Sequence, residues 1–314
     1  MNRIAKRIKL EIKLLLLNII KHFKSFPREN SILIFSDPRG GSTWLAELLN
    51  HIPNSIIYWE PLAPNHNKYI RKINFGWRQH IPENANWQKA NNAFDKILQL
   101  NPLNEWTTKR FNVSNYVDCK IPIIKFCRGN HLIHWLCNQY QFKYKPIVLL
   151  RHPFAVVASQ LKQGGWDYTF DGFTIPNMSH NDTYLKNKEF LESLQSKEES
   201  LVAIWCITNR ELQLPNSKWI LCFYEDLLLN TSEAIEDILK EWKIEMPKNL
   251  YGNLHKASFT TVDLAEDSSQ KQLAKWHHYF NDEMQLKLQR VLNHFEINIY
   301  SKDSLYPINR YKNV

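Results

Sequence analysis

The sequence lacks features that mark membrane-spanning and secreted proteins. No apolar run approaches the roughly 20 residues that a transmembrane helix needs, and within residues 1–28 the longest uncharged stretch is Leu14–Ile20. No cleavage site of small residues follows that stretch, so we expect no secretory signal peptide. These absences leave a globular chain of 314 residues as the working expectation.

Cysteine is also scarce, and its pattern argues against disulfides and metal sites. The five cysteines make an odd count, and Cys206 and Cys222 lie within apolar stretches. Reduced, buried thiols are therefore expected, and with them a cytoplasmic location. No cysteine or histidine spacing resembles a zinc site, and no Asp-x-Asp motif is present. We accordingly predict a protein that needs no metal.

The excess of positive charge is confined to one end of the chain. The net charge is +9, but residues 1–28 contain eight lysines and arginines against the single acid Glu11. This segment thus carries +7 and leaves +2 for residues 29–314. A nearly neutral body predicts no nucleic-acid partner, since such partners are bound by broad basic surfaces.

The basic segment has the periodicity of an amphipathic helix. Apolar residues recur at steps of three and four with lysines between them, at Ile4, Ile8, Ile12, Leu15, Ile19 and Phe23. Such a helix can lie on an anionic membrane surface as a peripheral contact, or it can pack on the body of the protein. The sequence leaves both readings open, and it says nothing about the oligomeric state.

Residues 29–314 have the pattern of a single α/β domain. Near-continuous apolar runs alternate with helical patterns, as expected for a central parallel sheet of about five strands flanked by helices. Helices are expected at Ser42–His51, from Pro153 to Gly164, after a capping box of Asn230 with Glu233, and at 265–278 and 282–295. The expected strands are Ser31–Ser36, Ser55–Trp59, Ile121–Phe126, Pro146–Leu150 and Trp219–Tyr224.

Two long stretches interrupt this alternation. Residues 62–118 are rich in Asn and Trp, and residues 164–196 are polar and aromatic. Insertions of this length on a regular scaffold often build substrate pockets or lids, so we expect a substrate to enter between them. Their aromatic residues can stack on sugar rings or pack in the core: Trp77, Trp87, Trp166, Tyr168 and Phe170.

The first segment with chemical content joins the first strand to its helix. It contains Pro-Arg-Gly-Gly-Ser-Thr-Trp, from Pro38 to Trp44. Two glycines allow a tight turn, and the free N–H groups of the helix start favour an anion. Arg39 adds a positive charge and Ser42 and Thr43 add hydroxyl donors, so the loop predicts a phosphate or sulfate site. It lacks the Gly-Lys-Ser/Thr ending of a Walker loop.

The second segment follows the fourth strand and reads Leu-Arg-His-Pro-Phe-Ala-Val-Val-Ala-Ser, from Leu150 to Ser159. Arg151 ends the strand at the edge where open α/β proteins bind ligands. Ser159 lies about two turns into the following helix, within reach of a phosphate held there.

Together the two segments resemble the superfamily of sulfotransferases that use 3'-phosphoadenosine 5'-phosphosulfate (PAPS). Arg39 is typical of the carbohydrate and tyrosylprotein branch, whereas cytosolic members have Lys there. Tyr224-Glu225-Asp226 after the fifth strand, and a late loop with Lys256-Ala257-Ser258 before Trp276, are similar as well. The resemblance covers about residues 31–295 and implies PAPS as co-substrate.

The resemblance also implies a role for each matching residue. The first motif would bind the 5'-phosphosulfate, and its Arg39 would act as a catalytic residue in contact with the bridging oxygen and the leaving phosphate. Trp44 would lie against the adenine, and Arg151 and Ser159 would hold the 3'-phosphate. The late loop would close over the nucleotide. His152 stands where the superfamily often has Asp, with little expected effect. The cofactor-binding set so implied is Arg39, Gly40, Gly41, Ser42, Thr43, Trp44, Arg151, Ser159, Lys256 and Ser258.

Transfer of the sulfuryl group needs positioning, charge stabilisation and a base for the acceptor hydroxyl. Glu60 follows the second strand and projects at the same edge as Arg39, and desolvation by its aromatic neighbours is expected to raise its pKa. The carbohydrate branch also has Glu there, which favours Glu60 as base and a glycan as acceptor. The rival bases are His66, His80, His131 and His134.

Several alternatives remain at this stage. Lys125 and Arg128, near the end of the third strand, can contact an acidic acceptor or the sulfuryl group, although solvated surface positions are the simpler interpretation. The pair His277-His278 falls within a predicted helix and predicts no functional site. A tyrosine or small-alcohol acceptor, a P-loop-like kinase and a binding module without activity also stay open, the kinase being disfavoured by the absent Walker lysine.

Overall fold

The computed structural model describes residues 3–164, 170–214, 216–250 and 269–308. Five parallel strands form one sheet in the order β2-β3-β1-β4-β5. Each predicted strand is confirmed to within one residue at either end. The strands are β1 (Ile32–Ser36), β2 (Ser55–Trp59), β3 (Ile121–Cys127), β4 (Ile147–Leu150) and β5 (Ile220–Phe223).

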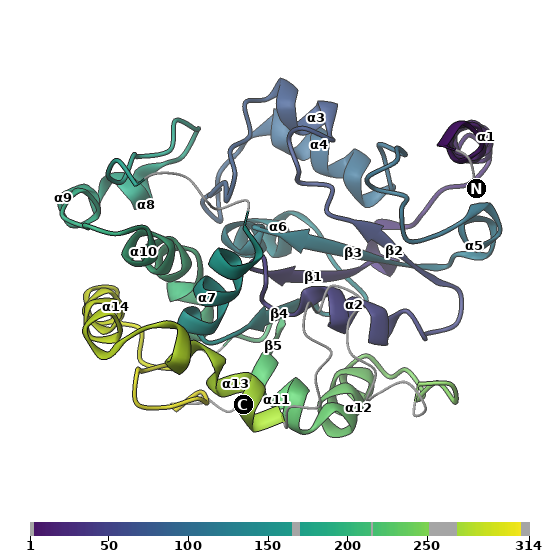
Figure 1. The fold of residues 1–314 in the computed structure, drawn as a ribbon. Helices are drawn as coiled ribbons and strands as arrows, with labels where there is room; N and C mark the ends of the chain where they lie inside the picture. Colours follow the sequence, from purple (N-terminus) through teal and green to yellow (C-terminus); the bar gives the residue numbers. More distant parts are fainter. Residues whose placement is uncertain (1–2, 165–169, 215, 251–268, 309–314) are drawn as a thin grey trace.

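Helices cover both faces of the sheet, which gives the predicted three-layer α/β architecture (Figure 1). Alternate residues of β1 enter different cores: Leu33 and Phe35 pack on one side, and Ile32 and Ile34 on the other. One face is covered by α2 (Ser42–Leu49), α11 (Tyr224–Leu229) and α12 (Thr231–Glu241). The other face is covered by α4 (Gln88–Leu98), α6 (Ile133–Gln139), α7 (Pro153–Gln163), α10 (Lys197–Asn209) and α14 (Asp282–His294).

The helices expected after the first and fourth strands are confirmed as α2 and α7. The capping box predicted at Asn230 is wrong, because its side chain makes no capping hydrogen bond. The reason is that α11 begins directly at the end of β5. Asn230 therefore lies between two helices, and its backbone N–H donates to the carbonyl of Asp226 at 2.8 Å to end α11.

The two insertions contain short helices that weak periodicity did not predict. Residues 62–118 hold α3 (Lys68–Lys72), α4 and α5 (Val113–Asp118), and residues 164–196 hold α8 (Asp182–Leu185) and α9 (Lys188–Glu192). Three 3-10 turns complete the connections, at Arg28–Asn30, Asn130–Leu132 and Arg210–Gln213. The C-terminal pair is present as α13 (Ser269–Tyr279) and α14, while residues 265–268 lie outside the described part of the chain.

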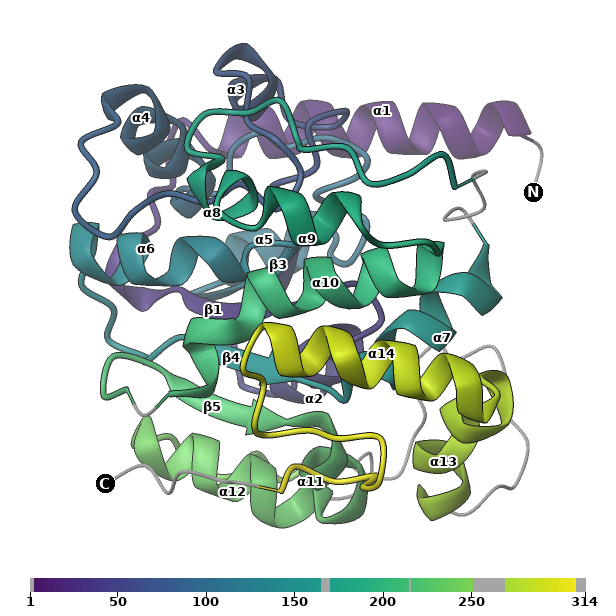
Figure 2. The ribbon, with the colours of Figure 1, turned by 90° about the vertical axis from the view of Figure 1, so that its left-hand side faces the viewer.

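The expected N-terminal helix is α1 (Arg3–Ile20), which lies along the top of the molecule in Figure 2. Its one fully buried side chain, Leu17, joins the core on the α4 side of the sheet. No helix among the described residues is long and apolar enough to cross a membrane.

The buried carboxylate of Glu225, just after β5, ties three segments together. It accepts hydrogen bonds from the backbone N–H of His152 and from the hydroxyl of Tyr300, both at 2.9 Å. Burial raises the pKa of Glu225, which these hydrogen bonds and Arg151 partly offset.

We predict that Glu225→Ala lowers the free energy of unfolding by about 1–3 kcal/mol, because two buried donors lose their acceptor. Glu225→Gln, which keeps one acceptor oxygen in the same place, should cost less. Thermal and urea unfolding of both variants would measure the difference. Equal loss in the two variants would contradict the hydrogen-bonding explanation.

Candidate functional site

The carboxyl ends of the five strands meet at one edge of the sheet, and the predicted anion loop lies at its centre after β1. Two of its residues must be glycine on steric grounds. A Cβ at Gly40 would come within 2.2 Å of the Ser36 hydroxyl oxygen. At Gly41, where φ is +95°, a Cβ would lie 2.4 Å from the ring of Tyr224. The loop backbone can therefore turn tightly into α2, with the first helical N–H groups facing the edge.

The structure brings Arg39, Arg151 and Ser159 together, although the first two lie 112 positions apart in the chain. Arg39 Nε donates to Ser159 Oγ at 3.0 Å, and Arg151 Nη1 donates to the Arg39 carbonyl at 2.9 Å. Partial burial and then the charge of Arg151 lower the pKa of Arg39. Two guanidinium groups held this close repel each other, and a bound anion of high charge would relieve that repulsion.

Tyr224 lies beside the cationic corner that Arg39, Arg151 and Ser159 form. Its ring lies 4.3 Å from the guanidinium carbon of Arg151 and packs edge-on against Trp44 at 6.2 Å. Trp44 itself is buried in the α2-side core, and Ser42 is buried in the first turn of α2. The adenine contact predicted for Trp44 stays a prediction.

His152, at the position that is often Asp in the resembling superfamily, caps the start of α7. Its Nδ1 accepts a hydrogen bond from the backbone N–H of Phe154 at 3.2 Å and so caps α7. Its ring stacks on Trp276 of α13 at 4.6 Å. Burial lowers the pKa of His152 to about 3, so the ring is neutral and Nδ1 is available as an acceptor.

A second group of polar residues connects the end of β2 to the anion loop. The Glu60 carboxylate contacts Lys125 Nζ at 2.5 Å, and the same ammonium donates to Cys127 Sγ at 3.0 Å. Cys127 Sγ lies 3.8 Å from Ser42 Oγ. The structure thus joins Glu60 to Ser42 through a continuous chain of polar contacts across β2, β3 and α2.

The simple interpretation of Lys125 as a solvated surface residue is wrong. Its side chain is only 2% exposed, because it lies within β3 on the face that α2 covers. Burial disfavours its charge, but Cys127 and Glu60 outweigh burial and raise the pKa of Lys125. A buried ammonium of this kind needs its carboxylate partner.

The pKa of Glu60, in contrast, is lower than the sequence predicted. Burial by itself would raise it, as predicted, but the charge and hydrogen bond of Lys125 more than compensate. The net effect holds the pKa of Glu60 below its ordinary value of 4.5. Glu60 is therefore a stable carboxylate at neutral pH.

The 62–118 insertion supplies the walls around Glu60. Trp106 Nε1 donates to the Glu60 carbonyl at 3.2 Å, and Lys109 Nζ lies about equally close to two rings, 4.0 Å from Trp59 and 3.9 Å from Trp106. Loss of hydration lowers the pKa of Lys109 to about 8, helped by the neighbouring cations. Two lysines thus lie beside Glu60: Lys125, which the sequence offered as a contact residue, and Lys109, which it did not.

Of the rival histidines, only His66 lies beside Glu60, through its stacking on Trp106 at 4.4 Å. His80 and His131 pack on each other at 5.2 Å, and a ring nitrogen of His131 contacts the Ile207 carbonyl at 2.6 Å. His134 contacts Glu211 at 3.7 Å. These contacts place the last three against α10 and the turn that follows it.

Asp37, the first residue of the anion loop, is a site residue that the sequence analysis missed. It is buried, accepts from Asn209 Nδ2 at 2.7 Å and lies 3.7 Å from Arg78 Nε of the insertion. Burial raises the pKa of Asp37, which the Arg78 charge partly offsets. The loop is thereby fixed to α10 and to the insertion. Arg128 lies over the exposed ring of Trp77 at 4.4 Å.

Four charged residues around this edge have left-handed backbone conformations. The φ angles are 71° at Arg39, 38° at Glu60, 57° at Arg78 and 63° at Arg128. Such conformations are unfavourable for residues with a Cβ and persist only where the surroundings impose them. These φ angles set the directions in which the four side chains project from the backbone.

Some predicted residues lie outside the described part of the chain: Lys256, Ser258, Trp166 and Tyr168. A metal site among the described residues is not found, since no group of His, Cys, Asp and Glu there has ligand geometry. His277 stacks on its neighbour Trp276, and no described contact gives the His277-His278 pair a function.

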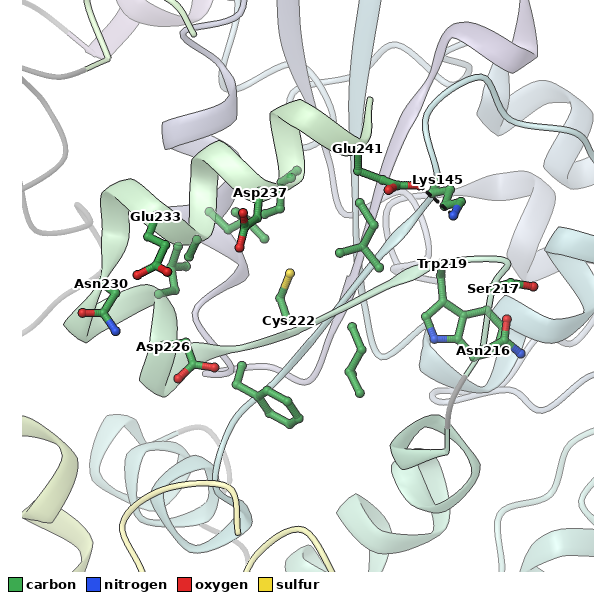
Figure 3. A pocket seen from close by; sticks show the side chains of 17 residues that line it. Lys145, Asn216, Ser217, Trp219, Cys222, Asp226, Asn230, Glu233, Asp237 and Glu241 are labelled. Atoms are coloured by element: carbon green, nitrogen blue, oxygen red, sulfur yellow. Dashed lines mark ion pairs between the residues drawn. The ribbon is translucent and has the colours of Figure 1, made fainter. Parts of the chain in front are cut away.

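A cavity of about 460 Å³ lies elsewhere, between β5 and α12 (Figure 3). Its polar lining is acidic, with Asp226, Glu233, Asp237 and Glu241, and its Lys145 is paired with Glu241 at 2.6 Å. Because carboxylates repel a polyanion, this cavity does not suit a nucleotide. The anion site remains at the strand ends.

Comparison with known proteins places this geometry in a family. The sulfotransferase domain family matches residues 29–296. Solved structures that resemble the chain include the sulfotransferase domain of the curacin biosynthetic pathway, with 14% identity over 84% of this chain and 96% of that one and a TM-score of 0.44. The sulfotransferase domain of the Synechococcus PCC 7002 olefin synthase has 16% identity over 88% and 98%, with a TM-score of 0.43.

A mouse sulfotransferase, SULT7A1, complexed with PAP, has 13% identity over 92% of each chain and a TM-score of 0.45. A search of curated proteins gave no significant match. The family match spans most of the chain and includes both the anion loop and the Glu60 site. This protein therefore belongs to the sulfotransferase domain family.

Proposed function

We propose that this protein transfers the sulfuryl group of PAPS to a carbohydrate hydroxyl, with Glu60 as the base. The observation that carries the proposal is the convergence of Arg39, Arg151 and Ser159 beside the anion loop. PAPS has anionic groups at both its 5' and 3' positions, so a corner with two guanidinium groups, a hydroxyl and helix N–H groups matches its charge. Family membership favours this reaction over the kinase alternative.

The polar chain from Glu60 to Ser42 supports the assignment of the base. In an in-line displacement, the acceptor oxygen forms a bond to sulfur as the bond from sulfur to the 5'-phosphate oxygen breaks. The acceptor proton passes to the Glu60 carboxylate. Lys125, between Glu60 and the Cys127–Ser42 contact, is placed to stabilise negative charge on the transferring group.

The residues around Glu60 support the proposal of a glycan as acceptor. Trp77 is 45% exposed, and the Arg128 guanidinium lies 4.4 Å from its ring. Arg128 directly follows Cys127, whose thiol contacts the same Lys125 ammonium as Glu60. An exposed aromatic ring near a base is suited to packing against the apolar face of a sugar. A tyrosine side chain could use the same ring, and acceptor assays distinguish the two.

A thermal-shift titration with a stable nucleotide tests the donor site. Adding 3',5'-ADP, the desulfated donor, should raise the melting temperature, since a ligand at 100 times its Kd stabilises the folded state by about 2.7 kcal/mol. Arg151→Ala should abolish the shift, whereas Arg290→Ala on exposed α14 should retain it. A shift with ATP and Mg²⁺ but none with 3',5'-ADP would instead support a kinase.

Substitution of Glu60 tests its role as the base. Glu60→Gln should lower kcat/KM by about 10²- to 10⁴-fold, because the variant cannot accept the proton, while the 3',5'-ADP shift stays unchanged. In the wild type, the acidic fall in kcat/KM should lie below pH 4.5, because the pKa of Glu60 is lowered. The stabilisation from the Lys125 pair is likewise present above that pH and is lost as the pH falls through the lowered pKa.

A fall centred near pH 6.5 would point to a histidine base, and His66→Ala would then remove the activity that Glu60→Gln had left. Unfolding measured across the same pH range separates loss of activity from loss of structure.

Sulfation assays with several acceptors test the choice of a glycan. With labelled PAPS, sulfation of a glycan panel should exceed that of a tyrosine peptide and of a simple alcohol. Trp77→Ala should raise the acceptor KM with little change in the 3',5'-ADP shift, and Tyr279→Ala, at a similarly exposed aromatic residue, serves as the control. Preference for the tyrosine peptide would overturn the glycan assignment but leave the donor site standing.

A further inference from the structure

The N-terminal helix α1 has an inner face that holds it on the body. Leu17 is fully buried, and Leu10, Lys13 and Leu14 on the same side are half-buried. Lys13 Nζ donates to the Thr108 carbonyl at 2.6 Å. The helix is therefore attached along its inner face, as the packing alternative of the sequence analysis required.

The opposite face of the helical segment is apolar and turned away from the body. With 3.6 residues per turn, its positions lie roughly half a turn from Leu17. The helix runs as a straight rod along the edge of the molecule (Figure 2). Side chains on this outer face are between 49% and 66% exposed: Ile4, Ile8, Ile12, Leu15 and Ile19. Leu16 at the flank of the face, and Phe23 in the turn after α1, are exposed as well. Large aliphatic and aromatic groups gathered in one stripe normally mark an interaction surface.

The charge around this stripe identifies its partner. Eight lysines and arginines fall within residues 1–28, with one acid, and the exposed Lys6, Arg7 and Lys9 lie in the first turns of α1. Two copies of the chain meeting through this stripe would bring two segments of +7 together. An anionic lipid surface instead offers both an apolar layer for the stripe and negative charge for the basic residues.

We propose that α1 binds the surface of an anionic membrane, lying in the plane of the headgroups with its outer apolar face inserted and the body on the water side. The inner contacts at Leu17 and Lys13 would keep the body attached to the docked helix. This proposal is independent of the proposed reaction, because the outer face contains no residue of the donor or Glu60 sites.

Sedimentation of the full chain with lipid vesicles tests the proposal. The protein should bind vesicles that contain phosphatidylserine much more strongly than vesicles of phosphatidylcholine alone. Combined substitution of Ile8, Ile12 and Leu15 by Ser should abolish binding. Serine at three equally exposed leucines elsewhere, Leu185, Leu214 and Leu286, should leave it unchanged. Lys9→Gln should weaken binding about five-fold, the contribution of one basic residue at such a surface.

Three results would overturn the proposal. Binding could be absent from both kinds of vesicle, or it could be lost equally in the two triple-serine variants. The third is a dimer by light scattering that the α1 substitutions dissociate, without vesicle binding, which would make a second copy the partner. The 3',5'-ADP shift of the α1 variant should match the wild type, so that failure here is distinguishable from failure of the donor site.

Discussion

The site depends on one buried ion pair. Lys125 and Glu60 are both removed from most solvent, and a single buried charge without its partner costs several kcal/mol. The pair therefore fixes the end of β2 against β3. Through Cys127 it also reaches the first turn of α2, where the anion loop ends. This interaction is therefore the contact that connects the proposed base, Glu60, to the anion loop.

Local patterns in the sequence predicted the scaffold well because the scaffold depends on local causes. Doubly buried strands read as apolar runs, and Pro153 marks a helix start in the sequence itself. In the 62–118 insertion, α3 and α5 are too short to show a period, but α4 buries Ala90, Phe94 and Ile97 at helical spacing, which was a usable signal of a helix. Lys125 was misjudged as solvated, yet a lysine inside the run Ile-Pro-Ile-Ile-Lys-Phe-Cys has no solvent side in a covered sheet. That conflict was a usable signal of a buried partner.

Other features of the site could not be predicted from local sequence. The approach of Arg78 to Asp37, and of Trp106 to Glu60, depends on how a long insertion folds back over the strand ends. The lowered pKa of Glu60 follows from Lys125, which lies 65 residues away in the chain. The convergence of Arg39 and Arg151 was predictable because strand ends in a parallel sheet must meet at one edge, whatever lies between them.

The left-handed residues at that edge have a consequence for how the protein can change. Each of Arg39, Glu60, Arg78 and Arg128 holds about 1–3 kcal/mol of backbone strain that glycine would release. Selection for thermal stability alone would therefore favour glycine at Arg39 and Glu60, where the proposed reaction needs a charge. A more stable descendant of this chain would be expected to gain its stability elsewhere, or to lose its catalysis.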